Sequence, residues 1–298
     1  NMEHFSFFSM TLGGVLILAG CGAQPIPVTT QDNGEVKDTT SLIEEWHQLT
    51  ETDYEHVNMD RAVIIANELA LQDENGLDPI FKVLEDPEEK PMAKMLAVVS
   101  LSPHIDDSHV ERLMPLTEPE YDSATRGCAA HLLGICMDSN AFFRVMELTE
   151  DEDAHVSKVA TMVMLRKGDP NVIPKILEIW DDPNASPKDR EEIVLGMPAP
   201  AALKNIRIFK EALCDEALNL TARSHAAKVL GDLASKAEIP AIKACLEKIS
   251  DTALVENVKS AIASIEEREK EGGGAPKIQM PDGVGLVFKP KDADDAAT

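Results

Sequence analysis

The sequence predicts an all-α fold made of stacked, repeated pairs of antiparallel helices, for three reasons. A basic residue returns at intervals of 33, 32, 32, 32, 33 and 36 residues, a register that scattered lysines and arginines would not keep. Apolar residues recur at helical spacing between these positions, and proline and glycine punctuate the runs. A fixed period of roughly 20 to 50 residues is typical of stacked repeat proteins. The basic positions are Arg61, Lys94, Arg126, Lys158, Arg190, Arg223 and Lys259.

The chain opens with an apolar segment, residues 5–20, that is too short to span a bilayer comfortably. It ends in Leu-Ala-Gly-Cys at 18–21, a tetrapeptide that resembles the lipobox of bacterial lipoproteins. The resemblance implies a signal peptide, cleavage between Gly20 and Cys21, and a covalent lipid on the Cys21 thiol. One feature departs from the usual pattern, because no Lys or Arg precedes Lys37. An unlipidated signal segment or a membrane anchor is therefore the alternative.

A tether follows the cysteine. Residues 22–41 are rich in Pro, Thr, Gln and Asp and show no helical period. About 20 flexible residues span roughly 25 Å on average, so we expect the body to lie near a membrane and to meet it only through the lipid. The resemblance places the protein in the bacterial cell envelope. Because Gly22 rather than Asp follows the cysteine, it implies the outer membrane or the periplasmic face where the cell has two membranes.

Each period is predicted to hold two helices. Proline suits the first turn of a helix, where its missing N–H would have no partner in any case. Glycine is the usual residue just past a helix end, where the backbone turns left-handed. First helices are predicted to begin at Pro79, Pro174 and Pro240, and second helices to end at Gly134, Gly168, Gly196 and Gly231.

The second helices carry the most specific pattern. Segments 126–134 and 223–231 align position by position as Arg-x-x-Ala-Ala-x-x-Leu-Gly, and Asp122 lies four residues before the first. With the proline-led first helices, this pattern resembles the HEAT-repeat family over about 42–270, as roughly seven helix pairs. The resemblance implies a right-handed α-solenoid with second helices on its concave side. It also assigns the recurring basic residues to a polar ladder between repeats.

The resemblance weakens in the fifth pair. The run from Arg190 lacks the alanines and ends in Met-Pro-Ala-Pro at 197–200, so we expect a local break or a wider joint there. After the repeats, three glycines at 272–274 end the helical array. The last segment contains a short apolar run, 284–288, and we expect it to be disordered. Strand addition to a partner and folding back over the last repeat are the alternatives.

The chain is therefore predicted to have four regions: a signal peptide at 1–20, the lipidated cysteine and flexible tether at 21–41, a HEAT-like repeat domain at 42–270, and a disordered tail at 271–298.

The composition limits the partners. The chain has 298 residues and a formal net charge of -25, which a nucleic-acid phosphate surface would repel. The acidic surface is either simply solvated or forms a groove for a basic partner or divalent cations. The acid clusters at 85–89, 150–153 and 181–182 lack the ligand spacing of an EF-hand loop, and we expect them to cap helices instead.

A search for catalytic motifs finds none. No His is followed by Glu, and the chain has no CxxC, no glycine-rich phosphate loop and no Gly-x-Ser-x-Gly elbow. We expect His131 and His225 to be isolated histidines with satisfied hydrogen bonds. Trp46 and Trp180 are expected to pack in the core, with ligand stacking as the alternative.

The cysteines of the repeat region raise a separate question. Cys128 and Cys136 lie about 12 Å apart along one helix, too far for a disulfide. Cys214 and Cys245 are separated by about one period and could face each other on adjacent first helices. The sequence favours small buried thiols over a bridge there.

The sequence thus predicts a membrane-tethered, non-catalytic scaffold that binds a protein or peptide, with no cofactor besides the lipid and no nucleic-acid partner. The alternative is an enzyme-associated HEAT-like protein that resembles the bilin-lyase type and attaches or positions a chromophore. That class is cytoplasmic, so an exported chain argues against it. A HEAT-like nucleic-acid glycosylase is disfavoured by the charge.

Overall fold

The computed structural model describes residues 38–51, 58–72 and 75–270, and within these ranges all regular structure is helical. Fifteen α-helices, α2 to α16, and several short 3-10 turns follow one another along this part of the chain. The prediction of an all-α protein is confirmed for the described residues. Cys21, the signal peptide, the tether before 38 and the tail after 270 lie outside them.

Fourteen of the helices form seven consecutive pairs, and the two helices of each pair pack together. The pairs are α2 (Thr39–Thr50) with α3 (Met59–Gln72), α4 (Asp78–Glu85) with α5 (Pro91–Leu101), α6 (Val110–Leu113) with α7 (Ser123–Leu133), α8 (Ser139–Leu148) with α9 (Ala154–Lys167), α10 (Ile173–Asp181) with α11 (Pro187–Gly196), α13 (Ile206–Cys214) with α14 (Leu220–Leu233), and α15 (Ile239–Leu246) with α16 (Thr252–Lys270).

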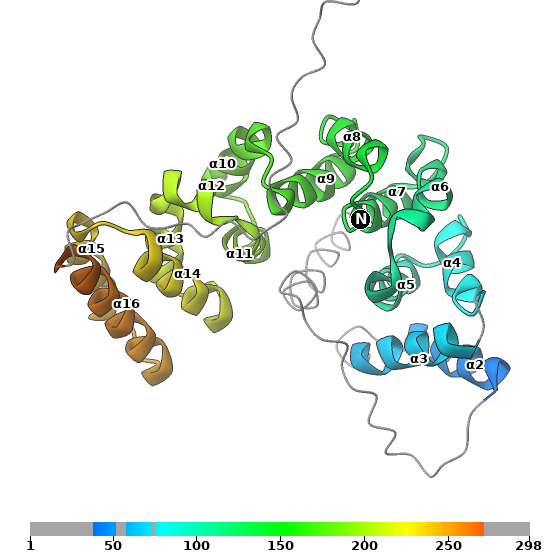
Figure 1. The fold of residues 1–298 in the computed structure, drawn as a ribbon, viewed down its shortest axis with the longest axis horizontal. Helices are drawn as coiled ribbons and strands as arrows, with labels where there is room; N and C mark the ends of the chain where they lie inside the picture. Colours follow the sequence, from blue (N-terminus) through cyan, green and yellow to red (C-terminus); the bar gives the residue numbers. More distant parts are fainter. Residues whose placement is uncertain (1–37, 52–57, 73–74, 271–298) are drawn as a thin grey trace, which may run out of the picture.

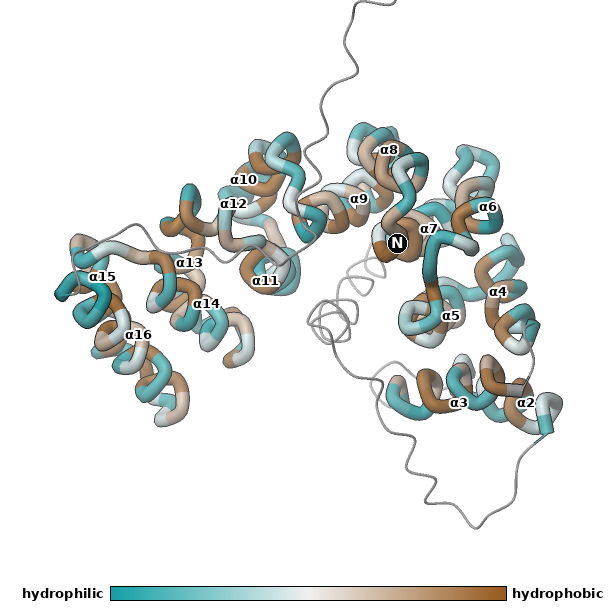
Figure 2. The backbone as a smooth tube through the Cα atoms, in the orientation of Figure 1, coloured by the Kyte–Doolittle hydropathy of each residue, from teal (hydrophilic) through white to brown (hydrophobic). Residues whose placement is uncertain are grey.

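The pairs succeed one another along an open arc (Figure 1). The second helices pack in series, in the order α3, α5, α7, α9, α11, α14 and α16, and lie on the inner side of the arc in this view. The substantial helix contacts of the described chain all join elements that are close in sequence. One hydrophobic core nevertheless runs from Leu42 to Ile265, because each pair buries apolar residues against the next. Figure 2 shows these apolar residues recurring in every helix.

Helix starts follow the predicted signals. A proline lies in the first turn of three first helices: Pro79 in α4, Pro174 in α10 and Pro240 in α15. Carboxylate side chains cap several other helices by accepting backbone N–H bonds: Asp122 caps α7, and Asp153 caps α9. Asp153 belongs to the acidic cluster at 150–153, so for this residue the capping prediction is confirmed. The first described helix begins at Thr39, slightly before the predicted repeat boundary at 42.

The glycines have two different roles. Gly168 ends α9 in the left-handed conformation, with a φ of 82°, as predicted. Gly134 follows α7 and Gly196 is the last residue of α11, both without a left-handed turn. The prediction is wrong for Gly231, which lies inside α14. A Cβ at Gly231 would lie 2.9 Å from the Cα of Ala261, so this glycine allows α14 and α16 to approach closely.

The fifth and sixth pairs are joined through an extra helix. After α11, the short α12 (Ala199–Lys204) precedes α13 and packs against α13 and α14, with Ala202 buried. The break predicted at 197–200 is therefore present, and an added turn of helix fills it.

Both tryptophans are core residues, as predicted. Trp46 on α2 is 2% exposed, and its indole N–H donates to the Ser100 hydroxyl on α5 at 2.9 Å. Trp180 on α10 is 5% exposed and donates to a carboxylate oxygen of Glu211 on α13 at 2.7 Å. Each indole thus links one helix pair to the next.

Candidate functional site

The recurring basic residues are paired with acids of neighbouring helices. Lys94 on α5 is only 1% exposed, and its ammonium donates to the Asp122 carboxylate at 2.6 Å and to the Thr125 hydroxyl at 2.7 Å. Asp122 also caps α7 by accepting the Thr125 N–H at 3.0 Å. A single carboxylate therefore caps the N-terminus of α7 and also neutralises the charge of Lys94 in the preceding helix pair.

Three further positions repeat this link between successive pairs. Arg126 reaches Asp151 at 2.5 Å, and Lys158 reaches Asp189, in the first turn of α11, at 2.7 Å. Arg190 approaches Asp215 at 3.7 Å and also donates to the Asp182 carbonyl at 3.0 Å. Because these cations are neutralised inside the array, they do not form an exposed basic stripe.

The remaining positions make other contacts. Arg61 forms a two-point ion pair with Glu45 in its own helix pair, at 2.6 and 2.9 Å. Arg223 donates to the Leu213 carbonyl at 3.2 Å, at the end of α13. Lys259, on the last helix, is 57% exposed and contacts Glu256 on the same helix at 2.8 Å. The links between pairs thus run from Lys94 to Arg190.

The electrostatics of the Lys94 pair depend on unequal burial. The Asp122 side chain is 41% exposed, whereas Lys94 has almost no contact with water. Burial by itself would raise the pKa of Asp122, but the hydrogen bonds from Lys94 and Thr125 outweigh it and hold that pKa below its usual value. The carboxylate is therefore ionised at neutral pH and offsets the buried ammonium.

His131 and His225 are both withdrawn from solvent. His131 on α7 is 3% exposed, and burial lowers its pKa to about 3, so the imidazole is neutral at pH 7. Its Nε2 has no hydrogen-bond partner among the described residues, which contradicts the expectation of a satisfied side chain. His225 on α14 is partly buried, and burial lowers its pKa as well.

Among the described residues, two cysteines are free and two are joined. Cys128 and Cys136 are buried thiols, and burial raises the pKa of both, that of Cys136 to about 11. Cys214 at the end of α13 and Cys245 on α15 form a disulfide with their Cα atoms 5.3 Å apart. The expectation of unpaired thiols at these two positions is wrong, because the packing of α13 against α15 brings them together.

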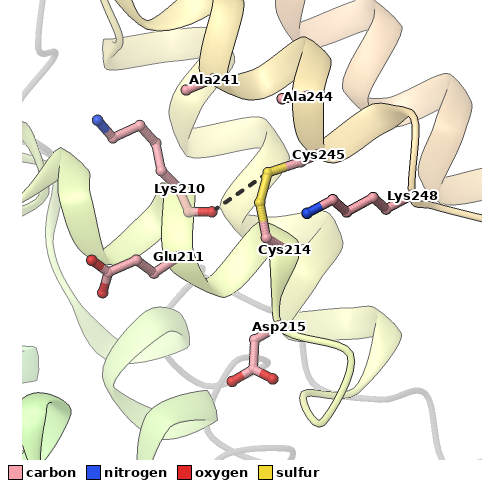
Figure 3. A pocket seen from close by; sticks show the side chains of 8 residues that line it. All are labelled: Lys210, Glu211, Cys214, Asp215, Ala241, Ala244, Cys245 and Lys248. Carbon is pink, nitrogen blue, oxygen red and sulfur yellow. Dashed lines mark hydrogen bonds between the residues drawn. A yellow bond between two sulfur atoms is a disulfide. The ribbon is translucent and has the colours of Figure 1, made fainter.

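An open pocket of about 480 Å³ surrounds this disulfide (Figure 3). Its lining combines the two sulfurs with small and charged side chains. Lys248 extends its ammonium toward the sulfurs, whereas Lys210 points away from them and forms an ion pair with Glu238 at 2.6 Å. The complete lining is Lys210, Glu211, Cys214, Asp215, Ala241, Ala244, Cys245 and Lys248.

Neither a metal site nor a membrane span is found in the part of the chain that the structure describes. No three His, Cys, Asp or Glu side chains there are grouped so that they could hold a metal ion. None of the helices at 38–51, 58–72 and 75–270 combines the length and the apolar character needed to cross a bilayer.

The candidate site is therefore the surface of the helix array, with the Cys214–Cys245 disulfide and its pocket near one end. The sequence pattern predicts the seven recurring basic residues but not their acid partners. It favours free thiols at Cys214 and Cys245, whereas these two cysteines form a disulfide. No protein-family model and no curated protein matches this chain.

Proposed function

We propose that this protein is a membrane-tethered, non-catalytic scaffold that binds a protein or peptide along a HEAT-like α-solenoid. The observation that carries the proposal is the arc of seven helix pairs, in which the second helices pack in series along the inner side. Stacked helix pairs offer more side surface than a globule of equal mass, and such curved surfaces suit extended partners.

The proposed solenoid is right-handed, and the ion pairs from Lys94 to Arg190 act as the ladder that fixes the stacking of its repeats. Each of these cations meets a carboxylate that lies about one period later in the chain, between 25 and 31 residues away. A ladder of this kind orients neighbouring pairs because a charge-assisted hydrogen bond is directional. The curvature of the binding surface therefore depends on these contacts.

The proposed location is the bacterial cell envelope, with a lipid on Cys21 as the only membrane contact. The Cys214–Cys245 disulfide supports an exported body, because structural disulfides form and persist in oxidising compartments and are rare in the cytosol. The lipobox resemblance and the disulfide are separate observations that lead to the same compartment.

The proposed partner is basic. The chain carries a net charge of -25, and the cations of the ladder are already neutralised by internal acids. The excess acids therefore determine the field that an approaching partner meets. Binding should weaken as the salt concentration rises, because contacts between exposed charges are screened within about 8 Å at physiological ionic strength.

A site-specific crosslinking experiment tests the scaffold proposal. A photoreactive residue replaces exposed Lys228 on the second helix α14 in one strain and exposed Glu178 on the first helix α10 in another. We expect one defined envelope protein to be captured from intact cells at position 228 and not at 178. Equal capture at both positions, or capture of many unrelated proteins, would contradict a specific inner-face partner.

The lipid anchor is tested separately with Cys21→Ser. We expect the protein to leave the membrane fraction, while its far-UV circular dichroism stays unchanged. Continued retention in the membrane fraction would contradict lipidation but would leave the scaffold proposal standing.

A further inference from the structure

The disulfide is unequally accessible on its two sides. Cys214 is the last residue of α13 and is exposed, whereas Cys245 on α15 is only 6% exposed. The flanking pocket is open, and the α15 side chains beside the sulfurs are the methyl groups of Ala241 and Ala244 (Figure 3). Because Cys214 is exposed and borders the open pocket, an external thiol can reach the disulfide from this side.

The pocket also holds a charge suited to sulfur exchange. Lys248 lies three residues after Cys245, and its ammonium points toward the two sulfur atoms (Figure 3). A cation at this place stabilises a thiolate that forms on Cys245. The Cys245 sulfur lies 4.0 Å from the Lys210 carbonyl oxygen, an acceptor that a reduced thiol can use but a disulfide cannot.

The disulfide joins two consecutive modules. α13 belongs to the sixth helix pair and α15 to the seventh, which is the last pair of the described array. Apart from the disulfide, α15 is held by side chains such as Ile239 and Ile242, and its helix has only eight residues. Terminal elements with few buried contacts are the ones that open most readily.

From these observations we propose that Cys214–Cys245 is a reversible thiol–disulfide exchange site for a dithiol that can close to a cyclic disulfide, and that its redox state controls how firmly α15 and α16 are attached. A thiolate of the dithiol attacks the Cys214 sulfur and forms a mixed disulfide. The electron pair of the broken bond passes to the Cys245 sulfur, which leaves as a thiolate beside Lys248. The second thiol of the reagent then attacks its own mixed-disulfide sulfur and releases Cys214.

The reaction balances without another reactant. The dithiol loses two electrons and two protons and becomes a cyclic disulfide, while Cys214 and Cys245 gain them and become two thiols. The reverse reaction, with the oxidised form of the same reagent, restores the link. The exchange thus removes the covalent connection between the last two helix pairs and leaves packing and polar contacts, such as the Lys210–Glu238 ion pair, to hold them together.

The test uses the full chain and dithiothreitol as the dithiol. After timed exposure to the reagent, accessible thiols are alkylated in native buffer and counted by mass spectrometry on separate peptides. We expect Cys214 and Cys245 to become alkylated while far-UV circular dichroism stays unchanged. The buried thiols of Cys128 and Cys136 should stay protected, which makes them an internal control for unfolding.

Two charge-matched variants and one structural readout complete the test. Lys248→Gln should slow the reduction about twofold to fivefold, the effect of one exposed charge interaction, whereas Lys210→Gln in the same pocket should not change the rate. Hydrogen exchange should speed up in α15 and α16 after reduction and stay unchanged in α3 to α9. Any of three results would overturn the proposal. The first is reduction of the disulfide only when Cys128 and Cys136 also become alkylated. The others are equal reduction rates for the two lysine variants and unchanged hydrogen exchange in α15 and α16.

Discussion

The buried ion pair between Lys94 and Asp122 allows a sharp prediction, because its two partners differ in solvation. Lys94 is 1% exposed and Asp122 is 41% exposed, with 2.6 Å between ammonium and carboxylate. Removing the carboxylate leaves a cation out of water with one neutral hydrogen-bond acceptor, the Thr125 hydroxyl. Removing the ammonium leaves a carboxylate that water still reaches and that still accepts the Thr125 N–H.

The magnitudes follow from this asymmetry. Asp122→Asn keeps the N-cap of α7, since Asn caps about as well as Asp, and therefore isolates the lost charge. Breaking a buried pair by removing one partner costs about 3–5 kcal/mol. Lys94→Met removes the buried charge with a side chain of similar shape and should cost about 1–2 kcal/mol, close to one charge-assisted hydrogen bond. The double variant should cost no more than Lys94→Met alone.

Urea-induced unfolding followed by far-UV circular dichroism measures these four free energies of unfolding. The coupling is the sum of the two single costs minus the cost of the double variant, and it should be about 3–5 kcal/mol, as large as the cost of Asp122→Asn alone. The reasoning would be refuted if Lys94→Met destabilised the protein as much as Asp122→Asn, or if the two single changes were simply additive. The first result would show that Lys94 is held mainly by packing, and the second that the pair does not interact.

Three further predictions concern pH, the disulfide and a helix contact. The pKa of Asp122 is lowered in the folded protein, so its ionised carboxylate stabilises the fold above the unfolded pKa of about 3.8. This stabilisation is lost as pH falls through the lower pKa of the folded protein. The free energy of unfolding, measured against pH, should show this acid-dependent loss in the wild type and not in Asp122→Asn. Replacing both Cys214 and Cys245 by Ala opens a loop of 31 residues and should lower the free energy of unfolding by about 3–4 kcal/mol. Urea unfolding measures this loss, with the reduced and the oxidised wild type as references. A loss below about 1 kcal/mol would argue against the disulfide. Gly231→Val should lower the free energy of unfolding by about 1–3 kcal/mol and lower the melting temperature, because the new side chain would meet the backbone of Ala261. Gly196→Ala should cost less, because its methyl group meets only the flexible side chain of Arg166.

Local backbone chemistry was readable from the sequence because its signals act within a few residues. Proline at 79, 174 and 240 begins a helix since its ring suits the first turn wherever the helix lies in space. Asp153 caps α9 because its carboxylate accepts the backbone N–H groups of His155 and Val156. The period of about 32 residues came from the same source, since every pair repeats the same set of local signals.

Contacts between repeats were decided only by the tertiary structure. Gly231 was taken for a helix end, but its lack of a side chain matters because Ala261 of the next second helix lies against it. Cys214 and Cys245 pair because α13 and α15 pack in a register that places their Cα atoms 5.3 Å apart, and spacing along the chain does not determine that register. The sequence alone thus determined which helices form, whereas their relative positions, and with them the ion-pair ladder and the disulfide, depended on packing between side chains distant in the chain.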